Sequence, residues 1–99
     1  MEQFLYFLRP ARENFIQTIT EEESAIIGEH FAYLQGLLAE GKLIIAGRTQ
    51  TDAPVGICIY YADSLEQAQQ IAENDPAVAK GVFHADVHPY SVALMKGQE

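Results

Sequence analysis

The order of the predicted elements is the feature that most constrains the fold of this chain, because the signals for a strand, a helix and a second strand occur twice in that order. Two segments follow the pattern of a helix N-terminus: Thr20 with Glu23, and Ser64 with Gln67. In each, a hydroxyl can accept from the backbone N–H three residues on, while the longer side chain reaches back to the cap. Each predicted helix lies between two short apolar segments, so the chain divides into two β-α-β halves.

The boundaries of these elements follow from turn and capping residues. The first helix is expected from its N-cap Thr20 to about Glu40, with Gly41 as its stop. The second is expected from Ser64 to about Asn74, because Pro76 disfavours helical geometry at the residue before it. Strands are predicted over 4–8, 43–47, 55–61 and 82–94, the last of them bent at Pro89, and residues 11–19 are predicted as a loop or lid.

This order predicts an α+β protein with the ferredoxin-like βαββαβ arrangement. Such a chain forms an antiparallel four-stranded sheet with two helices on one face, and 99 residues fit a single domain over 1–99. The strands at 4–8 and 55–61 are apolar at consecutive positions, whereas a sheet with one solvated face alternates. Two helices cover only one face, so we expect a second copy to cover the other in a homodimer.

The composition excludes several classes of partner. Fourteen acidic and six basic residues give a net charge of −8, and the basic residues are scattered, which argues against nucleic acid. No apolar segment approaches the ~18 residues of a membrane span, and the N-terminus lacks a signal-peptide pattern. We therefore expect a cytoplasmic protein with no membrane partner. The one cysteine, Cys58, excludes an internal disulfide and a cysteine-based zinc site.

A histidine in an apolar helical stripe is the main candidate for chemistry. His30 lies at helical spacing among Ile26, Ile27, Phe31, Leu34, Leu37 and Leu38. An unperturbed histidine has a pKa near ~6.5, so an imidazole can act as acid or base at neutral pH. Asp75, in the turn sequence Asn74-Asp75-Pro76, is the candidate partner that would orient the imidazole and balance its charge. The structural alternative is a core histidine satisfied by backbone or water, with Asp75 forming only an Asx turn or a cap at Pro76.

Three further residues are candidates for substrate binding. Arg9 and Arg48 each end a predicted strand, where a guanidinium could hold a substrate carboxylate through two parallel hydrogen bonds. An ordinary surface ion pair is the alternative for both arginines. Tyr6 could line a pocket, or it could pack within the sheet and at the dimer interface.

The spacing of the polar residues in the last predicted strand argues against a metal site there. His84, Asp86, His88 and Tyr90 alternate along this strand and so share one face. Residues two apart on a strand are separated by about 6.6 Å, and residues 84 and 88 by about 13 Å, so at most two neighbours could bind one ion. The sequence also lacks a glycine-rich phosphate loop, and we expect no cofactor.

Several segments together carry a family resemblance. They are 4–10, 28–34, 40–43, Ala46-Gly47, 74–76, 81–83 and 87–90. With these segments the chain resembles the YciI-like (YCII-related) family. The resemblance implies a dimeric α+β barrel fold, similar to muconolactone isomerase, and an active site built on a His-Asp pair that maps onto His30 and Asp75. Where that family pattern has Gly-Pro after the second strand, this chain has Gly47-Arg48, which could change a pocket edge or its charge.

These observations favour a small cofactor-free enzyme of lyase or isomerase type. His30 would be its general acid and base, Asp75 would orient His30, and the substrate would be a small organic acid or a lactone. The alternative is a non-catalytic module that binds a small molecule or a protein partner through the same cleft. A third interpretation is a domain that only dimerises. A histidine that can be reached from a cavity favours the enzyme, whereas a sealed one favours a structural role.

Overall fold

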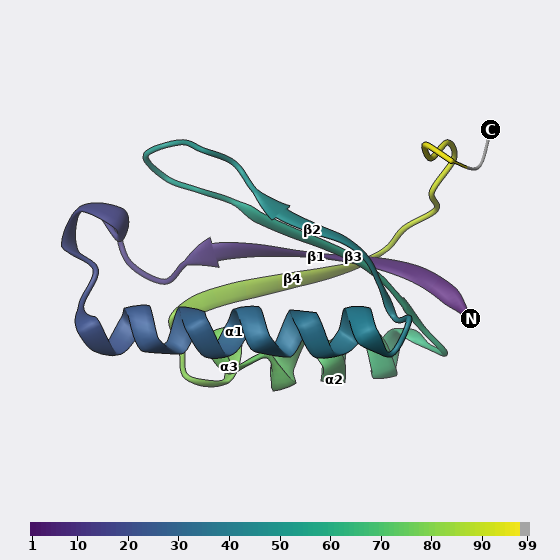
Figure 1. The fold of residues 1–99 in the computed structure, drawn as a ribbon, viewed down its shortest axis with the longest axis horizontal. Coiled ribbons are helices and arrows are strands. Elements are labelled where there is room, and N and C mark those ends of the chain that lie inside the picture. The colour runs from purple at the N-terminus through teal and green to yellow at the C-terminus, as the bar shows by residue number, and fades with distance from the viewer. Residues whose placement is uncertain (98–99) are drawn as a thin grey trace.

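The chain forms one four-stranded antiparallel sheet, and its two long helices lie on one face of it (Figure 1). The computed structural model describes residues 1–97. Its elements are β1 (Glu2–Pro10), a 3-10 turn η1 (Ile16–Thr18), α1 (Glu21–Ala39), β2 (Leu43–Arg48), β3 (Gly56–Ala62), α2 (Leu65–Asn74), α3 (Pro76–Ala79) and β4 (Phe83–Pro89). The strand order is β2-β3-β1-β4 and every neighbouring pair is antiparallel, so the predicted α+β ferredoxin-like arrangement is confirmed.

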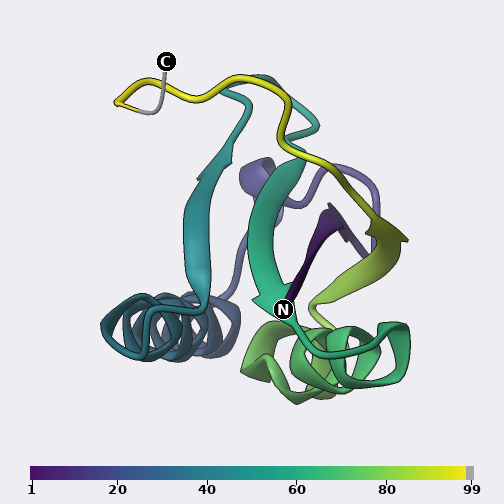
Figure 2. The ribbon, with the colours of Figure 1, turned by 90° about the vertical axis from the view of Figure 1, so that its right-hand side faces the viewer.

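The helical layer and the end of the chain lie on opposite sides of the sheet. Figure 2 shows α1 and α2 side by side under the sheet, with the segment that follows β4 on its other side. Because β2 is an edge strand, no further strand lies above the outer flank of α1. Among the described residues, no helix is both long enough and apolar enough to cross a membrane.

Capping residues explain where the two long helices begin. The Thr20 hydroxyl accepts from the N–H of Glu23, and the Glu23 carboxylate accepts from the N–H of Thr20, so the predicted capping box is present. At the start of α2 the Ser64 hydroxyl accepts from the N–H of Gln67, but the Gln67 side chain accepts from the N–H of Asp63. Only one half of the second predicted box therefore forms.

A short helix after α2 was not predicted from the sequence. Asp75 ends α2 and then acts as the N-cap of α3, where its Oδ1 accepts from the N–H of Ala77 at 3.0 Å. Pro76 is the first residue of α3, a position where the missing N–H costs no hydrogen bond. One carboxylate thus lies at the junction of two helices that meet at a corner.

The last strand is shorter than predicted. It ends at Pro89 and does not continue to residue 94, because β1, its partner, begins at Glu2 and offers little further backbone to pair with. The chain after it stays attached through the backbone oxygen of Gln3, which accepts from Tyr90, and through the Gln3 side chain, which accepts from Val92.

The core lies between the sheet and the helices. Its main cluster contains Phe4, Tyr6, Leu34, Leu37, Cys58, Tyr60, Ala62, Ala68, Ile71 and Ala72, and a smaller one contains Phe15, Ile26, Ala77 and Val82. The predicted apolar stripe of α1 is only partly in this core. Phe31 is 62% exposed and Leu38 is 58% exposed, because they lie on the outer flank of α1 beside the edge strand β2.

Candidate active site

A histidine and an aspartate from distant segments meet under the sheet. The Nδ1 atom of His30, on α1, lies 2.6 Å from Oδ2 of Asp75, at the junction of α2 and α3. The His30 side chain is 15% exposed and that of Asp75 is fully buried. The two residues are far apart in the sequence, and the packing of α1 against α3 brings them together.

The Asp75 carboxylate has hydrogen-bond donors at both of its oxygens. The Tyr6 hydroxyl donates to the same Oδ2 at 2.9 Å, while Oδ1 accepts from the N–H of Ala77. A buried carboxylate is costly unless such donors replace its water. Asp75 therefore caps α3 with Oδ1 and contacts His30 with Oδ2, so the same carboxylate does both.

Tyr6 lies behind this pair and does not line a cavity with His30. Its residue exposure is 1%, and burial, together with the nearby charge of Asp75, raises the pKa of its hydroxyl well above the usual range. It therefore stays a neutral donor at any ordinary pH. The structure does not bring Tyr6 into the His30 cavity, because it lies on the core side of β1 and its hydroxyl donates to Asp75; contact of Tyr6 with substrate stays a prediction.

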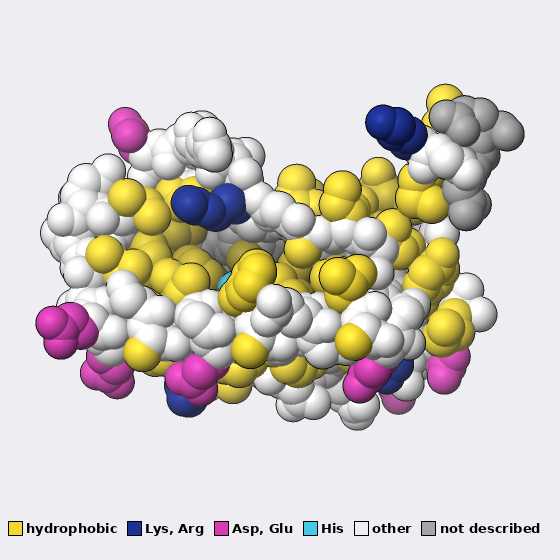
Figure 3. Space-filling view, viewed as in Figure 1, with side chains coloured by type: hydrophobic (Ala, Val, Ile, Leu, Met, Phe, Trp, Pro, Cys, Tyr) yellow, Lys and Arg dark blue, Asp and Glu magenta, His cyan; other side chains and the backbone are white. Residues whose placement is uncertain are grey.

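One face of His30 lines a cavity of about 440 Å³, called the His30 cavity below. It is lined by Leu8, Phe15, Ile16, Ile19, Ile27, His30, Phe31, Leu34, Ala46, Gly47, Arg48, Pro54, Gly56, Ile57, Cys58 and Phe83. Figure 3 shows a hollow between α1 and the β2–β3 hairpin, walled by hydrophobic side chains, with a small area of histidine inside it. Its size and its apolar walls are typical of a site for a small molecule.

The cavity arises because β2 begins against α1 and then leaves it. The N–H of Lys42 donates to the backbone oxygen of Leu37, which holds the start of the hairpin against the end of α1. Figure 2 shows β2 leading away from the helix after this point. The space that opens lies between His30 and Arg48, at the far end of β2.

The cavity wall also contains Cys58, whose thiol is not activated. Burial raises the pKa of its thiol to about 12. A thiol is a nucleophile or metal ligand only as its thiolate, so Cys58 contributes shape and not chemistry at neutral pH.

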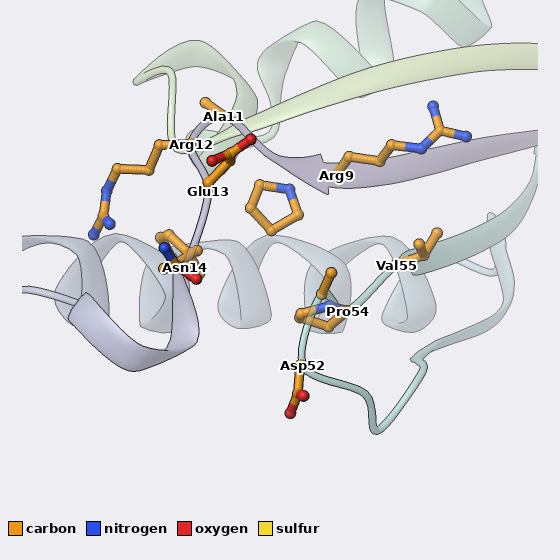
Figure 4. Close-up of a pocket in the computed structure, with 11 residues that line it drawn as sticks. Arg9, Ala11, Arg12, Glu13, Asn14, Asp52, Pro54 and Val55 are labelled. Atoms are coloured by element: carbon orange, nitrogen blue, oxygen red, sulfur yellow. The ribbon is translucent and has the colours of Figure 1, made fainter.

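Of the two arginines predicted to hold a substrate, only Arg48 lines the His30 cavity. Arg9 is exposed and forms an ion pair with Asp86 at 2.7 Å. It borders a separate, shallower hollow of about 470 Å³, in which the side chains of Arg9 and Arg12 point away from each other (Figure 4). The assignment of Arg9 to the same site as His30 is therefore corrected: its strand position places it on the face of the sheet that the helices do not cover.

The polar residues of β4 do not gather into a site. Asp86 pairs with Arg9, His88 lies with its ring edge-on to Phe7, and His84 is exposed. Over residues 1–97 there is no group of three histidine, cysteine or acidic side chains with the geometry to hold a metal ion.

The sequence also matches a known protein family. The YCII-related domain matches residues 4–90, which is nearly the whole chain and includes both His30 and Asp75. The chain belongs to the YCII-related domain family. A comparison with curated proteins finds no match.

Among solved structures, the YCII-related chain is similar to 5-chloro-2-hydroxyhydroquinone dehydrochlorinase (TftG) from Burkholderia phenoliruptrix AC1100, solved in complex with 2,5-dihydroxybenzoquinone. The TM-score is 0.66 at 24% sequence identity, over 89% of this chain and 93% of that one. At this identity the likeness shows the shared fold.

Proposed function

We propose that this protein is a small acid–base enzyme of lyase or isomerase type, in which His30 transfers the proton. The observation that supports this most is the position of His30, which binds a buried carboxylate on one side and lines an apolar cavity on the other. A histidine with only a structural role in the core would not need to line a cavity. The volume suits a small organic acid or a lactone.

The hydrogen bond to Asp75 assigns different roles to the two ring nitrogens. With Nδ1 donating to Asp75, the lone pair of a neutral imidazole is on Nε2, the nitrogen available to a bound molecule. Asp75 would also stabilise the imidazolium once Nε2 has taken a proton. General acid–base help of this kind supplies roughly 10²–10⁴-fold in rate.

The proposed step balances without an electron acceptor. Nε2 of His30 removes a proton from a carbon next to a carbonyl, and the C–H electron pair forms a carbon–carbon double bond as the carbonyl π pair moves to oxygen. In an isomerase the carbonyl re-forms as the imidazolium returns the proton to another atom of the same molecule. In a lyase the carbonyl re-forms, the electron pair forms a double bond to the carbon on the other side, and a leaving group departs from that carbon with its bonding pair. The activity named for the structural neighbour, a dehydrochlorinase, supports the second course, because loss of HCl is such a reaction.

The test is a search for turnover that depends on His30. A panel of small organic acids, lactones and chlorinated hydroxyhydroquinones is incubated with the protein in D₂O, and NMR follows carbon-bound proton exchange and product formation. We expect conversion or exchange of at least one compound, and a loss of at least about 10²-fold in His30→Gln.

His84→Gln is the matched control, because His84 is an exposed histidine on β4 outside the His30 cavity. It should turn over at the wild-type rate. Wild-type rates in His30→Gln would contradict the proposed mechanism. Binding of panel compounds to the His30 cavity with no exchange or conversion would favour a binding module instead.

A further inference from the structure

Within residues 1–97, the His30 cavity has one fixed positive charge and no lining carboxylate. Among the residues that line it, Arg48 is the single lysine or arginine, and none is an aspartate or glutamate. Figure 3 shows one basic side chain at the rim of the hollow, above the hydrophobic wall. The protein has a net charge of −8, so a cation at this cavity makes the local electrostatic potential opposite in sign to the overall charge.

The strand register places Arg48 on the cavity side of the sheet. Arg48 pairs with Gly56 across β2 and β3, two residues from the pair of Ala46 with Cys58. Because side chains alternate along a strand, Arg48 lies on the same face as Ala46, which also lines the cavity. Gly56 packs closely against Leu8, which also lines the cavity: a Cβ at Gly56 would approach the Leu8 side chain to 3.2 Å.

Arg48 also differs from the other arginines in its partners. Arg9 pairs with Asp86 and Arg12 pairs with Glu23, whereas within residues 1–97 Arg48 forms no ion pair. Its guanidinium therefore keeps its donors available at the rim of an apolar cavity. A planar guanidinium binds a carboxylate with two parallel hydrogen bonds.

We propose that Arg48 makes the His30 cavity selective for small organic anions, in which one negatively charged group is attached to an apolar carbon skeleton. The negatively charged group, a carboxylate or an ionised ring hydroxyl, binds Arg48, and the carbon skeleton fills the apolar part between Phe31 and Phe83, next to His30. Anion binding by Arg48 deepens the proposed function, and its consequence for turnover rests on that function. Selection between charged and neutral molecules does not depend on it, because binding requires no proton transfer.

The test compares isosteric probes that differ in charge. Benzoate and benzamide have the same shape, and 4-nitrophenolate supplies an ionised ring oxygen in place of a carboxylate. Each is titrated into the ¹⁵N-labelled full chain, and amide shifts of residues that line the cavity report binding. We expect benzoate to bind at least about tenfold more tightly than benzamide. Of the two anions, the one that binds more tightly identifies the preferred charged group.

Two variants separate the charge from its geometry. Arg48→Gln should weaken benzoate about tenfold and leave benzamide unchanged, while Arg48→Lys should restore part of the preference, because an ammonium keeps the charge but not the planar fork. Lys42→Gln removes a positive charge just before the opposite end of β2 and should change neither probe. Equal affinities for benzoate and benzamide, no binding of either anion, or unchanged benzoate binding in Arg48→Gln would each overturn the proposal.

The titration and the turnover panel together distinguish this proposal from the enzymatic one. If the wild type prefers benzoate to benzamide but turns over no compound of the panel, anion selection stands and the acid–base function fails. If a neutral lactone is turned over while Arg48→Gln matches wild type, the acid–base function stands and the selectivity proposal fails.

Discussion

His30 Nδ1 and Asp75 Oδ2 lie 2.6 Å apart, at the meeting point of α1 with the junction of α2 and α3. The carboxylate has no solvent exposure, whereas the imidazole lines a cavity. Nδ1 of the ring thus contacts a buried carboxylate, while the same ring borders the His30 cavity.

Tyr6 is expected to support the pair by hydrogen bonding. Tyr6→Phe removes the hydroxyl that donates to Oδ2 of Asp75 and leaves a buried carboxylate with one donor fewer. We expect the free energy of unfolding to fall by about 1–3 kcal/mol, measured by urea denaturation. Tyr90→Phe, at an exposed tyrosine, should stay within about 0.5 kcal/mol of wild type. A Tyr6→Phe protein as stable as this control would show that the hydrogen bond contributes nothing.

Asp75 is expected to combine a structural and a chemical role, which two variants separate. Asp75→Ala removes the cap of α3 and leaves the buried groups of His30 and Tyr6 without their acceptor. It should lower the free energy of unfolding by about 3–5 kcal/mol. Asp75→Asn keeps an oxygen that can cap Ala77 and should lose less stability, yet it removes the charge that balances His30. Equal stability losses in the two variants would contradict a separate capping role.

The stability of the fold is expected to fall at alkaline pH. Burial raises the pKa of Cys58 from 9.0 to about 12, so between these values the unfolded chain releases the thiol proton and the folded chain keeps it. Because the folded state then binds more protons, the free energy of unfolding decreases as pH rises, by at most about 1.4 kcal/mol per pH unit from this group. Tyr6 adds to the decrease above pH 10.

Urea denaturation at several pH values between 8 and 11 measures this decrease. Cys58→Ala should show a shallower slope than wild type, because one titrating group is gone, even if its stability at pH 8 is lower. The same slope in both proteins would contradict the assignment to Cys58.

We propose that the sheet face opposite the helices pairs with a second copy. By register, Leu5 and Phe7 of β1 share that face with Ile57 and Ile59 of β3, and Ile45 of β2 beside them is 60% exposed. We expect a dimer in analytical ultracentrifugation and dissociation in Ile59→Glu, since a buried unpaired charge is costly. Gln69→Glu adds the same charge on the exposed surface of α2 and should stay dimeric. A monomeric wild type would contradict the proposed pairing.

The sequence predicts most of the fold because the decisive signals are local. The capping box at Thr20 and Glu23 sets the start of α1, and the positive φ of Gly41 follows its end, as expected for a glycine stop. The strands were placed to within a few residues, except for the end of β4. The short helix α3 was not predicted, because Asn74-Asp75-Pro76 is equally compatible with a turn.

The candidate site was predicted less completely, because it depends on tertiary contacts. His30 and Asp75 were marked by their residue types and by a family resemblance. The bond from Tyr6 to Asp75 has no local signal, since it depends on which face of β1 points toward the helical layer. The walls formed by Phe15 and Phe83 come from a loop and a strand end, where no periodicity indicates the direction of a side chain. For the same reason Arg9 and Arg48 looked equivalent in the sequence but lie at different sites.

The tautomer of His30 tests the central claim most directly. Long-range ¹H–¹⁵N correlation NMR of the ¹⁵N-labelled protein, at a pH high enough for a neutral imidazole, distinguishes a proton on Nδ1 from one on Nε2. The account predicts the Nδ1-protonated form in wild type, with its proton donated to Asp75, and a mixture of tautomers in Asp75→Asn. A wild-type His30 with its proton on Nε2 would contradict the account, because no lone pair would then be available to a molecule in the His30 cavity.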